Sequence, residues 1–462
     1  MKRLTALLLA LALSQWLPAQ DQRDVEVVSI DEDQVDRGYL LWHRADEIGT
    51  DVDNYTVLTD YKGVEVHRWE SDLDGGGHTA YLLDGGRLLR MGIRDRSVVQ
   101  GQPVVAVDVV QILGPDSTVL WEMSASELGP LTFHHDLTPL PNGNILLLTY
   151  KPLSADGARE LGWDPGDSET VWSDGIIEIK PDLDDGSQEV LWEWSFEDHL
   201  IQDRAPDAPN YGVVRDHPER IDPHYPTSYA PMNIVRQHLN SVDYSPALDQ
   251  IVVSSFIYNE IWIIDHSTTT AEAASSAGGR GGQGGDLLFR YGNPEAYDMG
   301  SDSDRVFLKQ HDANWIDSEA PGEGNLIVHN NNTVIRPGML RRGDRGPEAS
   351  RGGLQRQQDL NGVSNVQELR LPVNPDGTYA RDDGRPFSAE RVWYWENPRY
   401  FAPFQGGARR LSNGNTLISN TVHRQVLEVR RDKEIVAEYK GSAPTYKSFK
   451  YAEGQLGTLL AK

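Results

Sequence analysis

The stretch QHDANWI at residues 310–316, followed by GNLIV at residues 324–328, decides how the chain is organised. A histidine stands at the start of an apolar run of strand length, and a Gly-Asn pair then turns the chain into a second apolar run. The same order of residues recurs as FHHDL at 133–137 with PNGNILL at 141–147, and as QHLNSVDY at 237–244 with DQIVV at 249–253. His135, His238 and His311 therefore share one position in three repeated units.

Two patterns extend this repeat over the rest of the chain. Six segments form an aromatic strand that often carries a carboxylate: VEVHRWE at 64–70, VLWE at 119–122, VLWEW at 190–194, LLFRY at 287–291, VWYWE at 392–396 and IVAEY at 435–439. The hairpin itself has two further copies, at 77–89 and 407–418, and we expect residues 38–58 to form an irregular sixth copy with its first strand at 38–42. Short strands in six repeated sets, with no long helical period, predict an all-β fold, a six-bladed β-propeller.

The N-terminus has the pattern of a secretory signal. Two basic residues precede a short apolar run, and small residues follow near position 19. We therefore expect residues 1–20 to be a signal peptide and the protein to be exported, periplasmic or extracellular. Residues 21–462 are expected to form a single propeller domain with long loop insertions at 196–232, 266–286 and 333–362.

Composition excludes several classes of function. The chain carries 43 basic and 70 acidic residues, a net charge of −27, which argues against nucleic acid or an anionic membrane as a partner. It contains no cysteine, so disulfides, thiolate metal sites and cysteine nucleophiles are all excluded. We expect no membrane span in the mature protein, because no segment beyond the signal is long and apolar enough.

The three repeated histidines are the candidates for chemistry. In a propeller the first strand of each blade faces the central channel, so His135, His238 and His311 are expected at the channel mouth. A histidine there can act as nucleophile, general acid or base, anion binder or metal ligand. The alternative is that each histidine only caps its strand. Such a cap would be expected in every blade, whereas the last unit has glycine and alanine at 407–408.

At these residues the sequence resembles the PAPS-independent aryl-sulfate sulfotransferases, the arylsulfotransferase family of exported six-bladed propellers. The similarity extends in register over roughly residues 38–440. It is carried by FHHD at 133–136 with LPNGN at 140–144, HLNSVDY at 238–244, QHDA at 310–313 and RLSNGNTLI at 410–418.

The resemblance implies a function and a set of roles. In this family a channel histidine, here His311, accepts a sulfuryl group from an aryl sulfate and passes it to a phenolic acceptor, and no cofactor is needed. His135 and His238 match two further active-site histidines. The other substrate-binding candidates are Asn240 beside His238, His134 beside His135, His199 and Arg424.

One family position differs in this chain. The arginine that the family carries in the strand after the HLNS motif falls by register at Phe256. An arginine there would be a bidentate clamp for an anion. Arg236, Arg290 and Arg424 are the arginines that could supply the charge instead.

Two other functions remain open from the sequence. A cluster of three histidines could bind a divalent cation, which would indicate a metal-dependent hydrolase or lyase. A non-catalytic binding propeller is the other alternative, because the arginine is missing. For His199, which lies on an insertion, a structural role in its loop is the alternative to a place over the channel.

Overall fold

The computed structural model describes residues 24–44, 55–73, 75–103, 105–225, 237–332, 363–382 and 384–460. The expected signal peptide at 1–20, the insertion at 333–362 and Arg236 lie outside the described residues. No helix of the described part is both long and apolar enough to cross a membrane.

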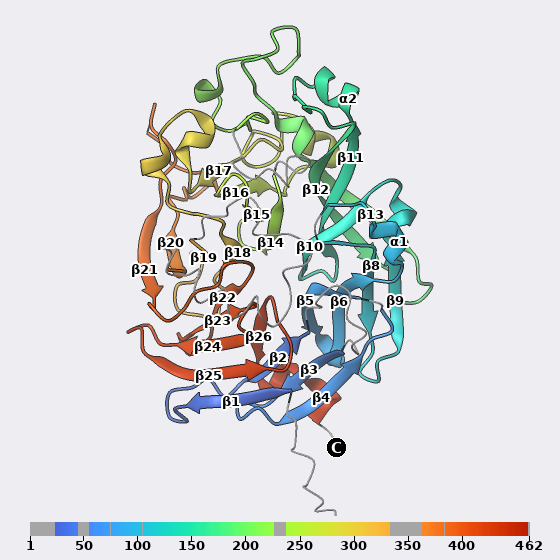
Figure 1. Cartoon of the computed structure of the whole chain (residues 1–462), viewed down its shortest axis with the longest axis vertical. Helices are drawn as coiled ribbons and strands as arrows, with labels where there is room; N and C mark the ends of the chain where they lie inside the picture. The colour runs from blue at the N-terminus through green and yellow to red at the C-terminus, as the bar shows by residue number, and fades with distance from the viewer. Residues whose placement is uncertain are drawn as a thin grey trace, which may run out of the picture.

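Six sheets surround a common axis as the blades of a six-bladed β-propeller, with one end strand of each sheet next to the axis (Figure 1). The fold class predicted from the repeats is confirmed. The first three blades, from the axis outward, are β26 (Ser448–Tyr451), β2 (Tyr39–His43), β3 (Tyr55–Thr59) and β4 (Glu65–Glu70); β5 (Gly75–Leu83), β6 (Arg87–Ile93), β8 (Val109–Leu113) and β9 (Val119–Ser124); and β10 (Thr132–Pro139), β11 (Ile145–Ser154), β12 (Thr170–Pro181) and β13 (Gln188–Ser195), with the short β7 (Ala106–Val107) beside β10.

The last three blades follow in chain order. They are β14 (Leu239–Ser245), β15 (Gln250–Ser255), β16 (Glu260–Asp265) and β17 (Phe289–Tyr291); β18 (His311–Trp315), β19 (Leu326–Asn330), β20 (Asn365–Arg370) and β21 (Glu390–Glu396); and β22 (Gly407–Arg410), β23 (Thr416–Asn420), β24 (Gln425–Val429) and β25 (Ile435–Gly441), with β1 (Val25–Ile30) added outside β25.

The helices formed by the described residues are short and lie in the connections. The α-helices are α1 (Arg96–Val99), α2 (Ala155–Glu160) and α3 (Thr270–Ala273). The 3-10 helices are η1 (Asp84–Gly86), η2 (Ala125–Leu128), η3 (Phe196–His199), η4 (Val214–Asp216), η6 (Pro294–Tyr297), η7 (Asp302–Asp304), η8 (Glu453–Gln455) and η9 (Gly457–Leu460).

The two ends of the chain close the ring. The C-terminal strand β26 pairs with β2, so that Tyr451 lies opposite Tyr39, and the N-terminal strand β1 pairs with β25 (Figure 1). The expectation that residues 38–42 form the innermost strand of the first blade is therefore wrong, because β2 is the second strand of that blade and β26 is the first. The cause is topological: a strand that arrives from the other end of the chain has no local sequence pattern that links it to this blade.

The aromatic-acidic segments form the outer strands, and their tryptophans join neighbouring blades. Alternation along β13 buries Trp192 and Trp194 while the residues between them face outward. Nε1 of Trp192 donates to Oγ1 of Thr268 in the next blade at 3.0 Å. Nε1 of Trp121 in β9 likewise donates to the Ser187 carbonyl of the third blade. These indoles bury a large apolar surface and use their one polar atom between blades.

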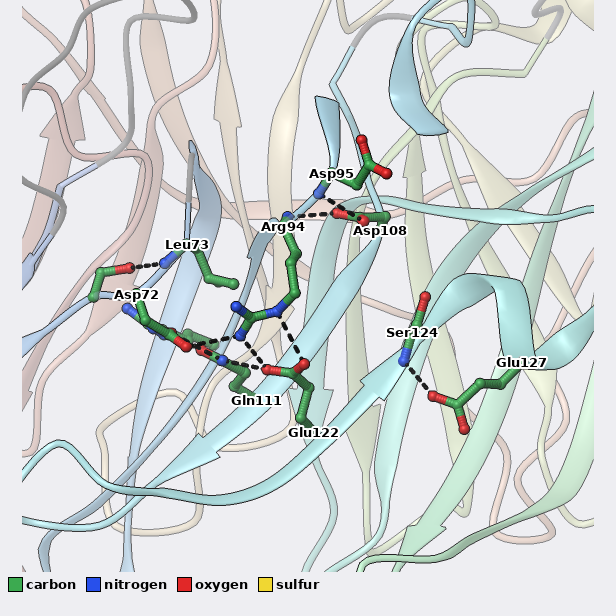
Figure 2. A network of polar contacts seen from close by, with 11 residues as sticks. Asp72, Leu73, Arg94, Asp95, Asp108, Gln111, Glu122, Ser124 and Glu127 are labelled. Atoms are coloured by element: carbon green, nitrogen blue, oxygen red, sulfur yellow. Dashed lines mark hydrogen bonds and ion pairs between the residues drawn. The ribbon is translucent and has the colours of Figure 1, made fainter. Parts of the chain in front are cut away.

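A polar row crosses the second blade and holds the loop that enters it (Figure 2). Asp72, between β4 and β5, accepts hydrogen bonds from Arg94 at 2.8 Å and from Gln111 at 3.1 Å. Glu122 on β9 accepts from the same two side chains. Because Arg94 and Asp72 are partly exposed, this network adds little stability and mainly sets the loop geometry.

Candidate active site at the ring axis

An irregularity of the inner strands places the three histidines. The ladder between β10 and β11 is interrupted after Phe133, that between β14 and β15 after Leu239, and that between β18 and β19 after His311. Left-handed residues stand beside these breaks: His135 with φ 51°, His238 with φ 50° and Asp312 with φ 50°. A bulge of this kind redirects a side chain out of the regular strand alternation.

The rings of the three histidines and Phe256 form a series of ring contacts. His135 and His238 contact each other edge to face, with ring centroids 4.5 Å apart. Phe256 lies between His238, at 5.0 Å, and His311, at 5.4 Å. All three histidines are buried. Tyr446, from the C-terminal segment, extends the group with its ring 6.0 Å from His311.

His311 is held in one tautomer by Asn331, which follows β19. Nδ2 of Asn331 donates to the carbonyls of Ala402 and Gln405, both at 2.7 Å, so that its Oδ1 faces the histidine. Nδ1 of His311 lies 2.6 Å from that oxygen and 3.1 Å from the Lys309 carbonyl. Both partners only accept hydrogen bonds, so Nδ1 carries the proton and Nε2 carries the lone pair. No described residue hydrogen-bonds Nε2.

Burial keeps this imidazole neutral. It lowers the pKa of His311 to about 4, although the hydrogen bond to Asn331 acts in the opposite direction. At neutral pH His311 is therefore an uncharged imidazole with a free Nε2, which is the form required of a nucleophile.

His134 connects His135 to a buried carboxylate. Nδ1 of His134 lies 2.9 Å from Nδ1 of His135, and Nε2 of His134 lies 3.2 Å from Oδ1 of Asp174 on β12. Tyr150 stacks on the His134 ring with centroids 3.6 Å apart. His134 thus contacts His135 from behind and is itself fully buried.

Lys309 brings a buried positive charge to the same place. Its Nζ lies 4.7 Å from the centre of the Phe256 ring and donates to the Phe256 carbonyl at 3.3 Å. Burial, with a contribution from Arg305, lowers the pKa of the Lys309 ammonium to about 7. Among the described residues no carboxylate lies within ion-pair distance of it. A buried ammonium without a counter-ion is costly, and an anionic ligand would offset that cost.

A charged hub lies next to the histidines and joins all six blades. Nζ of Lys447, just before β26, lies 2.6 Å from Asp136 and 2.8 Å from Asp312, the residues that follow His135 and His311. The two carboxylates also bind Thr79 of the second blade and the backbone N–H groups of Val242 in the fourth and Ala408 in the sixth.

The remaining candidates from the sequence take other positions. Asn240 is buried and donates from Nδ2 to the Gln310 carbonyl at 2.8 Å, next to His311. His199, on η3, stacks on Trp194 of β13 and lies 2.8 Å from Asp286, so its contacts are with the outer strands. The structure does not bring His199 to the other histidines, and its place agrees with a structural role in its loop.

The arginines considered as substitutes also lie elsewhere. Arg290 on β17 is fully buried and forms an ion pair with Glu260 at 2.5 Å. Arg424, in the turn between β23 and β24, donates to the Ser442 carbonyl at 2.9 Å. The cation beside Phe256 is Lys309, only two positions before His311.

Sequence reasoning missed Lys309, Asn331, Asp174 and Lys447. Lys309 had a usable signal, because it immediately precedes the QHDA motif. The other three are brought to the site by strands that are distant along the chain. No group of three or more His, Cys, Asp or Glu side chains in the described part of the chain could hold a metal ion. The ring of Phe256 contacts the rings of both His238 and His311.

Solved structures with partial similarity are distant. A protein of unknown function from Bacteroides caccae is 12% identical, with a TM-score of 0.43 over 87% of this chain and 93% of that one. The Cps50 (Swd1) β-propeller domain of Myceliophteria thermophila is 9% identical, with a TM-score of 0.41 over 90% and 89%. Virginiamycin B lyase from Staphylococcus aureus is 9% identical, with a TM-score of 0.34 over 90% and 88%. At these values none of the three bears on fold or function.

Comparison of sequences assigns the family. No curated protein matches the chain. The family model of the arylsulfotransferases (ASST) matches residues 24–352. This range includes four of the six innermost strands, β5, β10, β14 and β18, and all three histidines. The chain therefore belongs to the arylsulfotransferase family.

Proposed function

We propose that the protein transfers a sulfuryl group from an aryl sulfate to a phenolic acceptor through a sulfo-histidine at His311. The single observation that supports this most is the neutral His311 imidazole, whose Nδ1 is bound by Asn331 and whose Nε2 is free among the described residues. Family membership supports the class of reaction.

The proposed reaction has two balanced steps. In the first, the Nε2 lone pair of His311 forms a bond to sulfur while the bond between sulfur and the aryl oxygen breaks, and the aryl oxygen takes up a proton and leaves as a phenol. In the second, the hydroxyl oxygen of the acceptor attacks sulfur, the nitrogen–sulfur bond breaks and the hydroxyl proton returns to the enzyme. Asn331 stabilises the positive charge that develops on the ring, since its Oδ1 accepts the hydrogen bond from Nδ1–H throughout.

The donor is proposed to bind by its anionic sulfate group at Lys309. The Lys309 ammonium lies over Phe256, the position of the family arginine, and its charge has no carboxylate partner within the part of the chain that is described. Sulfuryl transfer, like phosphoryl transfer, depends mainly on positioning and on stabilising charge on the equatorial oxygens. His238, in contact with both His135 and Phe256, is placed to contribute to that stabilisation.

The test is transfer from 4-nitrophenyl sulfate to phenol. The release of 4-nitrophenol measures its rate. The wild type should show ping-pong kinetics and should acquire a covalent sulfuryl group on the peptide that contains His311 when the acceptor is omitted. His311→Ala should abolish both. His217→Ala is the matched control, because His217 is an exposed histidine paired with Glu219. A folded wild type that turns over no aryl sulfate, or a His311→Ala variant that retains transfer, would reject the proposal.

Export remains part of the proposal. It is supported by the signal-peptide pattern of residues 1–20. Expression of the full chain in a bacterial host, followed by cell fractionation and N-terminal sequencing, would test it. Uncleaved protein in the cytoplasm would contradict it.

A further inference from the structure

His134, a substrate-binding candidate from the sequence, is fully buried and has no role in the two transfer steps proposed above. Its two nitrogens lie 2.9 Å from Nδ1 of His135 and 3.2 Å from Oδ1 of Asp174. His134, Asp174 and the stacked Tyr150 are all fully buried, and His135 is 2% exposed. The three groups form a row of close contacts from a carboxylate to a histidine of the site, in which Nε2 of His134 and Asp174 lie at ion-pair distance without the alignment of a regular hydrogen bond.

The contacts determine where the protons lie. Asp174 accepts from the backbone N–H groups of His238 at 3.1 Å and Leu239 at 3.0 Å, which favour its ionised form, although burial raises the pKa of this carboxyl group overall. When Asp174 is ionised it only accepts, and the proton between the two groups is then on Nε2 of His134. Two lone pairs at 2.9 Å would repel each other, and therefore one further proton lies between the Nδ1 atoms of His134 and His135.

We propose that Asp174, His134 and His135 form a proton relay in which His135 gives a proton to the departing aryl oxygen and takes one from the attacking phenol. This assignment rests on the proposed function and adds a positioning role for His134 and Asp174. In this relay the Asp174 carboxylate, two rings away from the substrate, would offset the positive charge that the pair of histidines acquires on taking up the extra proton.

The proton balance closes over one cycle. At the start, Nε2 of His135 carries the proton that is transferred, Nδ1 of His135 shares its proton with His134, and His134 binds Asp174. When the bond between sulfur and the aryl oxygen breaks, the Nε2 proton passes to that oxygen and His135 becomes neutral. When the acceptor attacks, its hydroxyl proton moves to Nε2 of His135 and restores the starting state.

His311 does not fit this role. Burial lowers its pKa to about 4, and its Nδ1 is bound by an amide oxygen and a carbonyl oxygen rather than by a carboxylate. A neutral nucleophile at His311 and a proton carrier at His135 are therefore two functions separated by two different environments.

The test compares two donors that differ in their need for the proton. The 4-nitrophenolate ion is a good leaving group without protonation, whereas the phenolate ion is a poor one. We expect His134→Gln and Asp174→Asn to lower kcat/KM by roughly 10²-fold or more with phenyl sulfate, in line with the loss of general acid catalysis. With 4-nitrophenyl sulfate the same variants should lose only a few-fold. His238→Gln, which is outside the relay, should affect both donors to a similar degree.

Several outcomes would overturn the relay while leaving the transferase proposal intact. If the wild type is active but His134→Gln and Asp174→Asn reduce both donors by the same factor, these residues only maintain the structure. If neither donor is affected, the relay carries no proton. If the variants do not fold, the wild type alone still tests the relay. Its single-turnover transfer from phenyl sulfate should show a normal solvent isotope effect, and the effect with 4-nitrophenyl sulfate should be smaller. Equal isotope effects for the two donors would reject the relay.

Discussion

At the scale of single residues, the environment of each histidine separates its chemistry from that of the others. Asn331 holds His311 in one tautomer, and burial keeps it neutral. Asp174 and His134 stand behind His135 instead. Histidines at similar positions in the sequence therefore have different hydrogen-bond partners in the structure.

Replacing Asn331 by Asp tests the neutral state of His311. A carboxylate 2.6 Å from Nδ1 would favour the imidazolium and raise the pKa of His311 from about 4 by roughly 1–3 units. The nucleophile would then be protonated over a wider range, so the acid limb of the pH–rate profile should move to higher pH by a similar amount. The profile of kcat/KM with 4-nitrophenyl sulfate measures this shift, and an unchanged acid limb would contradict the assignment of His311.

Replacing Lys309 tests the anion site. Since the pKa of Lys309 is lowered to about 7, the ammonium loses its charge as the pH rises through about 7, and donor affinity should fall there. Lys309→Met should raise KM for an aryl sulfate by roughly 10- to 100-fold at pH 6, the loss of a charged hydrogen bond of about 1.5–3 kcal/mol. Lys309→Arg keeps its charge, so its KM should not rise between pH 6 and pH 8. A Met variant with an unchanged KM would exclude Lys309 from donor binding.

At the scale of elements, the outer strands are joined by indole nitrogens as well as by apolar packing. Trp192 on β13 reaches Thr268, which follows β16 in the next blade. Each blade of this kind is a sheet whose two faces pack on neighbours, and a buried N–H between two blades must find an acceptor.

Thr268→Val should test this contact, because it leaves Nε1 of Trp192 buried without its acceptor. We expect the free energy of unfolding to fall by about 1–3 kcal/mol. Thr268→Ser, which keeps the hydroxyl, is the matched control and should lose less. Urea denaturation monitored by tryptophan fluorescence measures both. A loss in Thr268→Val that is no larger than that in Thr268→Ser would show that the hydroxyl contributes no more than the methyl group.

At the scale of the whole molecule, the ring is tied at its centre by groups from every blade. Lys447 arrives with the C-terminal strand and binds Asp136 and Asp312, which in turn bind the three remaining blades. Burial alone would lower the pKa of Lys447, but the two carboxylates raise it. The strand that closes the ring therefore also brings the charged partner of Asp136 and Asp312, which lie beside His135 and His311.

Lys447→Met should show this coupling between closure and the site. Loss of the ammonium leaves two buried carboxylates without their shared cation, and we expect a loss of about 3–5 kcal/mol in the free energy of unfolding at pH 8. Burial acts to raise the pKa of Asp312, and in the wild type Lys447 and Arg409 outweigh it and lower that pKa. In the variant the pKa should rise, so protonation at lower pH relieves the repulsion.

The loss of stability should accordingly shrink between pH 8 and pH 5. Adding Asp136→Asn to Lys447→Met should recover part of it at pH 8, because one of the two unpaired charges is removed. Denaturation curves at both pH values provide the measurement. A loss that is independent of pH would show that Lys447 contributes by packing and not by charge.

The sequence by itself determined the six-fold repeat, the outer aromatic strands and the three histidines before apolar strands. These features depend on local patterns: strand alternation, turn residues and aromatic residues at a fixed place in each unit. The family motifs around His135, His238 and His311 are local in the same sense, so they could be found without coordinates.

Only the tertiary structure decided which strand completes the first blade and which groups surround the histidines. β26 pairs with β2 across nearly the whole length of the chain. The groups around the histidines also come from separate elements: Asp174 from β12, Asn331 from the end of β19 and Lys447 from the segment before β26. These three residues belong to no periodic sequence pattern. Each contacts groups that are distant along the chain, so its place at the site cannot be predicted from its neighbours in the sequence. The chemistry assigned to each histidine follows from these long-range partners, through burial, tautomer and nearby charge.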